Sequence, residues 1–325
     1  MGKVLVTGAT GFIGSHLTEL LVRKGYDVIA YDRYNLNNNY GWLDSSETIK
    51  NNIDFILGDI RDYDSVSKAM NGCESVFHLA ALIGIPYSYV SPQAYIKTNI
   101  EGTYNILESA KNFDLDNILI TSTSETYGTA QYTPMDENHP HVGQSPYSAT
   151  KIAADQLSIS YNKSFDLPIK IIRPFNTYGP RQSSRAIIPS IISQILNGST
   201  TINLGSTHPT RDLTFVSDTI DGFYKIFNEN SFIGESVNIG MNNEISIGDL
   251  VKKISRIMGT NVKIKVDKNR YRPKNSEVDR LICDNSKLVS NTNWKPKYDL
   301  NKGLKETVKW LSDNLSYFTN MGYNI

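Results

Sequence analysis

Short runs of β-branched and other apolar residues alternate with helical patterns along the first half of the chain. The apolar runs predict strands at residues 4–7, 28–31, 55–57, 75–79, 118–122 and 169–173. The segments between them carry apolar residues at helical spacing, as at 11–24 and 62–71, and glycines follow at the C-terminal ends, Gly25 and Gly72. Strands that alternate with helices predict a parallel, doubly wound α/β sheet. Right-handed crossovers then place the C-termini of the strands along one edge, where ligands bind.

The pattern loosens after about residue 178. It predicts helices at 186–196, 217–228 and 303–314, a strand at 236–239, and a helix after Ser246, where Ser-Ile-Gly-Asp resembles a capping box. We therefore expect a larger first domain over residues 1–178. Residues 179–325 would mainly form a smaller, discontinuous second domain, with parts of 214–240 and 286–315 returning to the first.

Composition narrows the class of function. Lys plus Arg and Asp plus Glu both number 33 in 325 residues, so the net charge is zero and nothing favours binding to nucleic acid or a membrane surface. The apolar run near the N-terminus is too short for a signal peptide or a membrane span, and the two cysteines are expected to be reduced. The five histidines lack ligand spacing, so no metal is expected. These features predict a cytoplasmic protein.

A glycine-rich turn lies between the first predicted strand and the first helix. Gly8, Gly11 and Gly14 stand in Thr-Gly-Ala-Thr-Gly-Phe-Ile-Gly, so Phe12 and Ile13 open the helix. Glycines at this position let the backbone turn tightly and approach a pyrophosphate, which then accepts hydrogen bonds from the helix start. The turn predicts a dinucleotide site.

Carboxylates end the next two predicted strands. Asp32 is placed to accept hydrogen bonds from the adenosine ribose and to repel a 2′-phosphate, which favours NAD over NADP. The following Arg33 could instead accommodate that phosphate. Asp59, followed by Ile60, could meet the adenine amino group or cap the next helix.

A tyrosine and a lysine lie one helical turn apart in Ser-Pro-Tyr-Ser-Ala-Thr-Lys, as Tyr147 and Lys151. An ammonium beside a phenol favours the phenolate and lowers the tyrosine pKa. Such a tyrosine can remove a hydroxyl proton while the carbon gives up hydride to a nicotinamide. The hydroxyl-rich segment 121–125 ends the preceding strand and supports this interpretation.

At this point the chain resembles the extended short-chain dehydrogenase/reductase superfamily over nearly its whole length. The matching motifs are the glycine turn, His78-Leu79-Ala80-Ala81, Asn99 in Asn-Ile-Glu-Gly-Thr, the Tyr147/Lys151 pair, Arg173-Pro174-Phe175-Asn176 through Arg181, and Trp294-Lys295-Pro296. The resemblance implies a Rossmann domain, NAD, a nucleotide-sugar substrate, and a homodimer built on helices near 92–112 and 147–164.

The resemblance also implies roles for single residues. Thr123 would assist Tyr147 at the sugar 4-hydroxyl, and Asn99 would support Lys151 through a water or backbone contact. Leu79, Ala80 and Ala81 would line the cofactor. The residues expected near the substrate nucleotide are Asn176, Arg181 and Arg211.

Glu125 separates the subfamilies that share these motifs. Galactose-type 4-epimerases carry a small hydroxyl or apolar residue there, whereas sugar 4,6-dehydratases carry a glutamate that removes the C5 proton once C4 is a ketone. Ser124 departs from deoxythymidine-diphosphoglucose 4,6-dehydratases, which have aspartate, and resembles GDP-mannose 4,6-dehydratase. The group that protonates the leaving 6-hydroxyl stays open. UDP-glucuronate decarboxylases share Thr-Ser-Glu, so they remain an alternative.

The substrate end most resembles the GDP-N-acetylglucosamine 4,6-dehydratases of legionaminic-acid biosynthesis. Arg272 would contact the diphosphate and Glu277 the nucleotide ribose. The segment Pro86, Tyr87 and Ser88 follows the fourth strand, where the sugar is expected. GDP is favoured over UDP. Three alternative functions remain: a UDP-sugar 4-epimerase, a UDP-glucuronate decarboxylase and a non-catalytic NAD-binding sensor.

Overall fold

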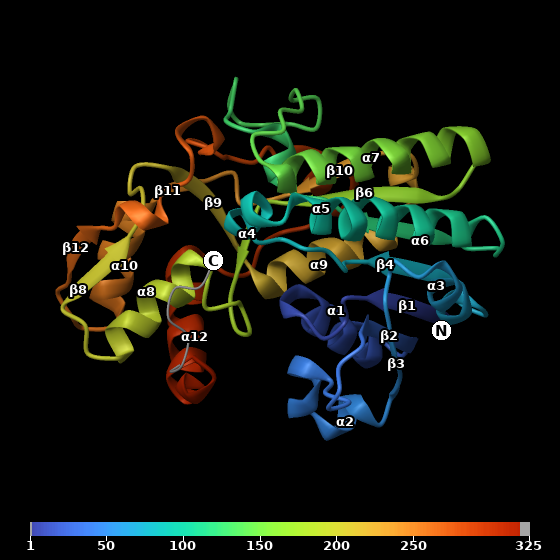
Figure 1. Ribbon diagram of the computed structural model, residues 1–325, viewed down its shortest axis with the longest axis horizontal. Helices are drawn as coiled ribbons and strands as arrows, with labels where there is room; N and C mark the ends of the chain where they lie inside the picture. Colours follow the sequence, from blue (N-terminus) through green and yellow to red (C-terminus); the bar gives the residue numbers. More distant parts are fainter. Residues whose placement is uncertain (1, 319–325) are drawn as a thin grey trace.

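Seven parallel strands form the central sheet in the computed structural model, which describes residues 2–318 (Figure 1). Their order is β10-β6-β5-β4-β1-β2-β3. The strands are β1 (Lys3–Thr7), β2 (Asp27–Arg33), β3 (Ile53–Gly58), β4 (Ser75–His78), β5 (Asn117–Thr121), β6 (Ile169–Pro174) and β10 (Ser236–Ile239). The chain starts at β1 and winds outward in both directions, so the predicted doubly wound α/β fold is confirmed.

Alternate residues of each strand enter different hydrophobic layers. Val4 and Val6 of β1 pack into one cluster with α1 (Phe12–Arg23) and α9 (Val216–Phe227). Leu5 packs into the other cluster with α3 (Tyr63–Met70), α6 (Gly102–Ala110) and α7 (Pro146–Phe165). A parallel sheet that is covered on both faces must be apolar on both faces. This explains why its strands were visible in the sequence as continuous apolar runs.

Helices cover both faces of the sheet and build most of the remaining part. They are α1 (Phe12–Arg23), α2 (Glu47–Lys50), α3 (Tyr63–Met70), α4 (Ile85–Val90), α5 (Pro92–Tyr95), α6 (Gly102–Ala110), α7 (Pro146–Phe165), α8 (Ile187–Leu196), α9 (Val216–Phe227), α10 (Ile247–Ile257), α11 (Ser286–Thr292) and α12 (Leu300–Asp313). A π-helical turn, Ile96–Glu101, joins α5 to α6. A 3₁₀ helix, Ser124–Tyr127, follows β5.

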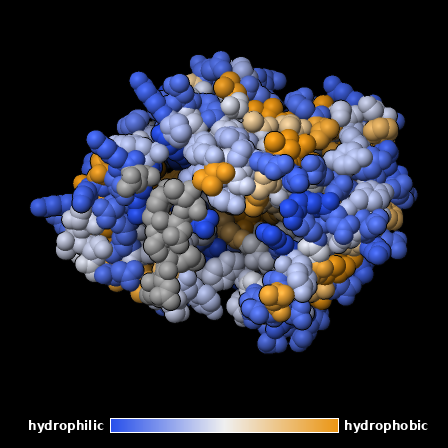
Figure 2. Space-filling model, in the orientation of Figure 1, coloured by the Kyte–Doolittle hydropathy of each residue, from blue (hydrophilic) through white to orange (hydrophobic). Residues whose placement is uncertain are grey.

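Two small sheets that the sequence did not predict belong to the second half of the chain. One has the order β11-β9-β7, and the other pairs β12 with β8. Their strands are β7 (Asn176–Tyr178), β8 (Thr201–Leu204), β9 (Thr210–Phe215), β11 (Glu244–Ser246) and β12 (Lys263–Val266). In Figure 1, α8, α10, β8 and β12 lie together at the left of the central sheet. Figure 2 shows the surface hollowed between this part and the sheet.

Local signals in the sequence ended and started helices as expected. Gly25, Gly72 and Gly198 all have positive φ, between 77° and 85°, just beyond helices. The Ser246 hydroxyl accepts a hydrogen bond from the backbone N–H of Asp249 and so caps α10. Within residues 2–318, no helix is both long and apolar enough to cross a membrane.

Candidate active site

The glycine turn lies between β1 and α1 at the carboxyl edge of the sheet. Gly8 has a φ of +70°, and a Cβ on Gly14 would lie 2.0 Å from the Gly8 carbonyl oxygen. The N-cap of α1 is Gly11, which offers no side-chain acceptor, so no side chain caps the N–H groups at the helix start, where Phe12 and Ile13 lie. A close backbone approach and free helix-start donors fit a dinucleotide pyrophosphate.

Asp32 at the end of β2 holds this turn. Its Oδ2 accepts hydrogen bonds from the Thr10 backbone N–H at 2.8 Å and from the Thr10 hydroxyl at 2.6 Å. The neighbouring Arg33 is exposed and donates only its backbone N–H to Asp32. The carboxylate therefore faces the glycine turn, where the pyrophosphate is predicted, and its contact with the adenosine ribose stays a prediction.

Asp59 does not cap the next helix, because Asp62 does so. Asp59 instead binds Arg61 through both carboxylate oxygens, and this hydrogen bonding lowers the pKa of Asp59. The following Ile60 is buried and approaches Gly102 of α6. Of the two roles considered for Asp59, the helix cap is wrong and the adenine contact stays a prediction.

The segment after β4 lies against the glycine turn. A Cβ on Gly8 would meet the Ala80 backbone nitrogen at 2.9 Å. Leu79 donates its N–H to the Thr7 carbonyl, and Ala80 donates to the Thr7 hydroxyl. Residues 79–81 therefore line the same end of the sheet as the glycine turn.

His78 is buried beneath this segment, between the hydroxyls of Thr7 at 2.8 Å and Thr103 at 3.2 Å. Burial, together with the charge of Lys151, lowers the pKa of His78 to about 3. The imidazole is therefore neutral in the folded protein at physiological pH. It is a structural link between β1, β4 and α6.

This neutral histidine predicts a pH dependence of stability. The unfolded chain binds the proton near pH 6.5 and the folded chain only near pH 3, so stability is complete above pH 6.5 and is lost as the pH falls. The loss from His78 is about 1.4 kcal/mol per pH unit. Urea unfolding gives the free energy of unfolding at each pH between 6 and 4.5. In His78→Gln this free energy should fall with decreasing pH less steeply than in the wild type, by about 1.4 kcal/mol per pH unit. An unchanged slope would refute the assignment.

Tyr147 and Lys151 lie on the first turns of α7, as predicted. The helix starts at Pro146 and is capped by Ser145, whose hydroxyl accepts from the Ser148 backbone N–H at 3.1 Å. The Thr123 side chain is hydrogen-bonded to Tyr147. The Lys151 ammonium donates to the Thr121 carbonyl at 2.6 Å. β5 and α7 thus bring the threonine, tyrosine and lysine together.

The direction of the Tyr147 pKa differs from the sequence prediction. Burial raises the pKa of Tyr147, and the Thr123 hydrogen bond opposes this only in part. Burial likewise lowers the pKa of Lys151, against the favourable charge of Asp155. Burial therefore destabilises the phenolate by more free energy than its neighbours stabilise it. The spacing of the two residues in the sequence could not reveal this.

Asn99 lies in the π-helical turn and does not contact the lysine in any described interaction. Its side chain exchanges hydrogen bonds with the Leu82 backbone, at 2.8 and 3.0 Å, and donates to the Thr150 hydroxyl at 3.1 Å. It therefore ties the segment after β4 to the residue beside Lys151. A contact of Asn99 with Lys151 through water stays a prediction.

Glu125 lies in the 3₁₀ helix after β5, close enough for its charge to act on Tyr147. Its charge is among the groups that raise the Tyr147 pKa, and its side chain is only 10% exposed. Its backbone N–H donates to the Thr123 hydroxyl. The preceding Ser124 is buried in the same turn. A carboxylate and a phenol thus share one site.

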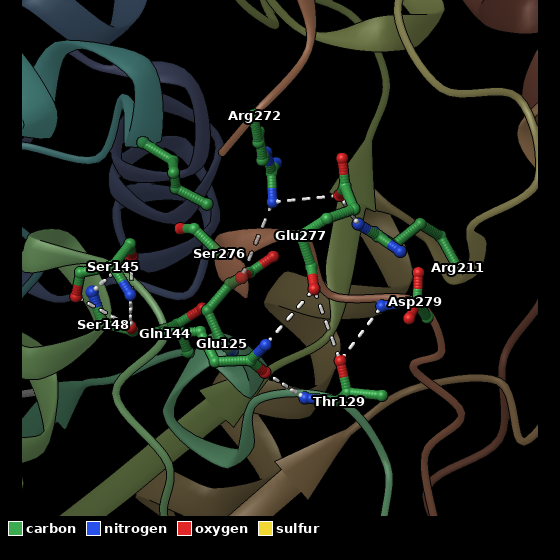
Figure 3. A network of polar contacts seen from close by, with 12 residues as sticks. Glu125, Thr129, Gln144, Ser145, Ser148, Arg211, Arg272, Ser276, Glu277 and Asp279 are labelled. Atoms are coloured by element: carbon green, nitrogen blue, oxygen red, sulfur yellow. Dashed lines mark hydrogen bonds and ion pairs between the residues drawn. The ribbon is translucent and has the colours of Figure 1, made fainter. Parts of the chain in front are cut away.

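Two arginines and a second glutamate complete this cluster, although they lie far along the chain (Figure 3). Arg272 Nη1 is 4.0 Å from Glu125 Oε2 and 3.6 Å from Glu277 Oε1. Arg211 Nη2 lies 3.4 Å from Glu277 Oε1. Burial lowers the pKa of Arg211, and the glutamates oppose that shift. The residues predicted for diphosphate and ribose therefore meet the predicted C5 base.

Other predicted substrate residues lie in different surroundings. Ser88 is buried in α4 and donates to the Ile85 carbonyl, whereas Pro86 lies in the first turn of that helix and Tyr87 is 37% exposed beside Tyr95. The Asn176 side-chain oxygen is buried without a described hydrogen-bond partner, and so is available to a ligand.

Arg181 lies against the cofactor helix. It has a φ of +70°, forms an ion pair with Glu19 at 2.6 Å and donates to the Ser15 hydroxyl at 3.2 Å. Both partners belong to α1. The guanidinium is therefore bonded to the helix that follows the glycine turn, and its contact with the nucleotide stays a prediction.

Sequence reasoning did not identify several side chains of the site. Gln144 and Tyr89 bind the segment that carries Arg272 and Glu277. The ring of Tyr95 packs edge-on against Tyr147, and the charge of Arg185 acts on Tyr95. Glutamine and arginine are common on surfaces, so no local spacing could have marked Gln144 or Arg185.

Comparison with known proteins agrees with this geometry. A family model described as GDP-mannose 4,6 dehydratase matches residues 5–307. A putative UDP-glucose 4-epimerase of Methanocaldococcus jannaschii is 34% identical, covering 96% of this chain and 99% of that protein. A dTDP-D-glucose 4,6-dehydratase of Homo sapiens is 31% identical (98% and 92%). A UDP-N-acetyl-alpha-D-glucosaminuronate decarboxylase of Bacillus cytotoxicus is also 31% identical (96% and 98%).

Solved structures give the same picture. The dTDP-glucose 4,6-dehydratase DesIV of Streptomyces venezuelae, with NAD bound, superposes with a TM-score of 0.88 at 26% identity, covering 98% of this chain and 99% of that one. The UDP-glucuronic acid 4-epimerase of Bacillus cereus, in complex with its nucleotide sugar and NAD, gives 0.88 at 31% identity (96% and 99%). The chain therefore belongs to the GDP-mannose 4,6 dehydratase family, within the NAD-dependent epimerases and dehydratases of the extended short-chain dehydrogenase/reductase type.

Proposed function

We propose that the protein is an NAD-dependent nucleotide-sugar 4,6-dehydratase, a hydro-lyase. The observation that carries this proposal is the placement of Glu125 beside Tyr147 and Thr123. A 4-epimerase needs a base only at the 4-hydroxyl, whereas a 4,6-dehydratase also needs a group that moves the C5 proton. Two acid–base groups in one buried site fit the second reaction.

The side chains divide the reaction between them. Tyr147, hydrogen-bonded to Thr123, takes the proton of the sugar 4-hydroxyl, and Lys151, which donates to the Thr121 carbonyl, lies one helical turn further along α7. Bound NAD supplies the hydride acceptor for C4 and the hydride returned at C6. The C4 ketone acidifies the C5–H bond, and Glu125 removes that proton. Tyr147 and Glu125 then hold one proton each, one of which goes to the 6-hydroxyl so that it leaves as water. C5 then regains a proton, so the product is a 4-keto-6-deoxy sugar.

Cofactor choice is proposed to depend on Asp32, which supports the glycine turn and repels a 2′-phosphate. Loss of a charged hydrogen bond corresponds to about 10- to 100-fold in affinity, so Asp32→Ala should weaken NAD binding by that factor and raise the NADP to NAD preference. Titration calorimetry with each dinucleotide measures both effects. Asp54→Ala removes an exposed carboxylate that binds Lys3 and is the matched control. An unchanged NAD affinity in Asp32→Ala would refute this role.

For the substrate we propose a GDP-hexose, with GDP-N-acetylglucosamine as first choice. The family model and the Arg272 to Glu277 segment support guanine, whereas the relatives described above act on UDP and dTDP sugars by their names. Legionaminic-acid biosynthesis is the corresponding pathway within this proposal.

The deciding experiment is mass spectrometry of the product in deuterated water. Purified enzyme is incubated with GDP-N-acetylglucosamine, and loss of one water with one deuterium gained at C5 is expected. Unchanged substrate would refute GDP-N-acetylglucosamine, and other GDP-hexoses and the UDP and dTDP sugars are then tested in the same way. A product of unchanged formula from those sugars would identify an epimerase.

UDP-uronate decarboxylation is a second candidate, favoured by Arg185. The sequence offered no arginine for a sugar carboxylate, but the structure brings Arg185 close enough to act on Tyr95, whose ring packs on Tyr147. Carbon dioxide released from UDP-glucuronate by the wild type and lost in Arg185→Gln would establish this reaction in place of the dehydratase.

The domain division and the homodimer belong to the same proposal. α9 and β10 pack with β6, and α11 packs on β10, whereas α12 packs on α8 and α10.

Ile96, Tyr104 and Phe165 expose 44–48% of their surface on the helical run 92–110 and on α7, which lie side by side. A twofold-related copy would bury them. Sedimentation equilibrium giving the monomer mass would refute the dimer.

A further inference from the structure

Arg272 lies between the carboxylates of two residues with different proposed tasks. Its Nη1 is 4.0 Å from Glu125 Oε2, the proposed C5 base, and 3.6 Å from Glu277 Oε1, the proposed ribose acceptor (Figure 3). Both glutamate side chains are largely buried, with 10% and 16% exposure. In this state one guanidinium therefore acts as a counter-ion for both.

The hydrogen-bonding capacity of Arg272 is not used by these contacts. Both distances exceed that of a hydrogen bond, and the buried Nη1 has no hydrogen-bond partner among the described residues. A buried N–H group without an acceptor is unfavourable. Phosphate oxygens would satisfy it, since the planar guanidinium matches their geometry.

Glu277 does not depend on Arg272 alone. Arg211 Nη2 donates to Glu277 Oε1 at 3.4 Å, while its Nη1 donates to the Thr210 carbonyl at 2.9 Å. Arg211 is thus fixed in the cluster and remains a partner for Glu277. If Arg272 turns toward a ligand, Glu125 loses its one ion pair among the described residues and keeps only the more distant charge of Arg211.

The chain segment that carries Arg272 is held at its other end. Tyr89 is hydrogen-bonded to the Ser276 hydroxyl at 2.6 Å, and Gln144 donates to the carbonyls of Asn275 and Glu277 at 3.3 and 3.2 Å. These contacts fix residues 275–277 to α4 and to the residue before the α7 cap. The Arg272 side chain can then change partner while Glu277 stays in place.

We propose that Arg272 is shared between the catalytic carboxylate and the substrate, so that diphosphate binding takes Arg272 away from Glu125 and frees this carboxylate to accept a proton only when a nucleotide sugar is in place. This inference rests on the proposed function in taking a nucleoside diphosphate as the ligand. It adds that recognition of the diphosphate and readiness of the C5 base are coupled through one side chain.

A double-mutant cycle on nucleoside diphosphate binding tests the coupling. GDP and UDP are titrated by calorimetry into the NAD-loaded enzyme. With Arg272 present, Glu125→Gln removes the competing carboxylate and should tighten binding by about three- to tenfold. With Arg272→Gln, the same Glu125 substitution should leave the affinity unchanged. Glu235→Gln, which removes a carboxylate paired with Lys287 at 2.9 Å, is the matched control and should have no effect.

Two results would overturn the proposal. One is an unchanged or weaker affinity in Glu125→Gln with Arg272 present. The other is equal tightening in both backgrounds, because a carboxylate that only repels the diphosphate acts without Arg272. If Arg272→Gln fails to fold, Arg272→Met replaces it in the cycle. This binding test does not depend on which product the enzyme makes, since an epimerase or decarboxylase with the same coupling would give the same affinities. If the enzyme is a dehydratase but the effects of the Glu125 and Arg272 substitutions on affinity are additive, only this inference is overturned.

Discussion

Glu125→Gln is expected to bind NAD and nucleotide but to lose elimination, with product formation falling by about 10³-fold. Glutamine keeps the shape of the side chain but cannot accept the C5 proton, and loss of a positioned acid–base group costs about 10²–10⁴ in rate. Mass spectrometry of the sugar in deuterated water measures both the loss of water and the deuterium gained at C5.

The control for this variant is Glu235→Gln, which lies outside the site and pairs with Lys287. It should keep wild-type turnover. Full dehydratase activity in Glu125→Gln would remove the carboxylate from the mechanism and with it the main support for a dehydratase.

Tyr147→Phe is expected to abolish the first oxidation, with a loss of about 10³–10⁴ in kcat. Because burial raises the pKa of Tyr147, the phenolate is a minor fraction in the wild type near neutral pH, and this fraction grows with pH. The wild-type rate should therefore rise about tenfold per pH unit on the acid side of its profile. The residual activity of the variant should lack this rise.

Tyr161→Phe is the matched control, since Tyr161 lies on the same helix and donates to Glu108 at 2.7 Å, away from the site. It should retain both the rate and the pH profile of the wild type. Turnover of Tyr147→Phe within tenfold of the wild type would exclude the tyrosine as the base.

The central sheet could be predicted because its strands are apolar on both faces and alternate with capped helices. The small sheets could not, since their strands are short and their burial is set by distant partners. β12 shows this clearly, because Lys263–Val266 is exposed throughout and has no core pattern. Its pairing with β8 depends on the fold of the intervening chain.

The same division applies to the site. The glycine turn and the Tyr147/Lys151 pair are local patterns, and the fold places them as predicted. The meeting of Glu125 with Arg272 joins residues far apart in sequence, and only resemblance brought them into one hypothesis. The predicted direction of the Tyr147 pKa shift was wrong, because the sequence shows the neighbouring lysine but not how deeply the phenol is buried.

The π-helical turn at Ile96–Glu101 holds a further consequence for how the protein could evolve. A π turn contains one residue more than the α-helical turn it replaces, and such turns persist mainly where they serve a function. Deleting one residue there would restore a regular helix from α5 to α6. It would also rotate Asn99 away from Leu82 and Thr150. The extra residue therefore serves to align Asn99 with Leu82 and with Thr150 of α7, the helix that carries Tyr147 and Lys151.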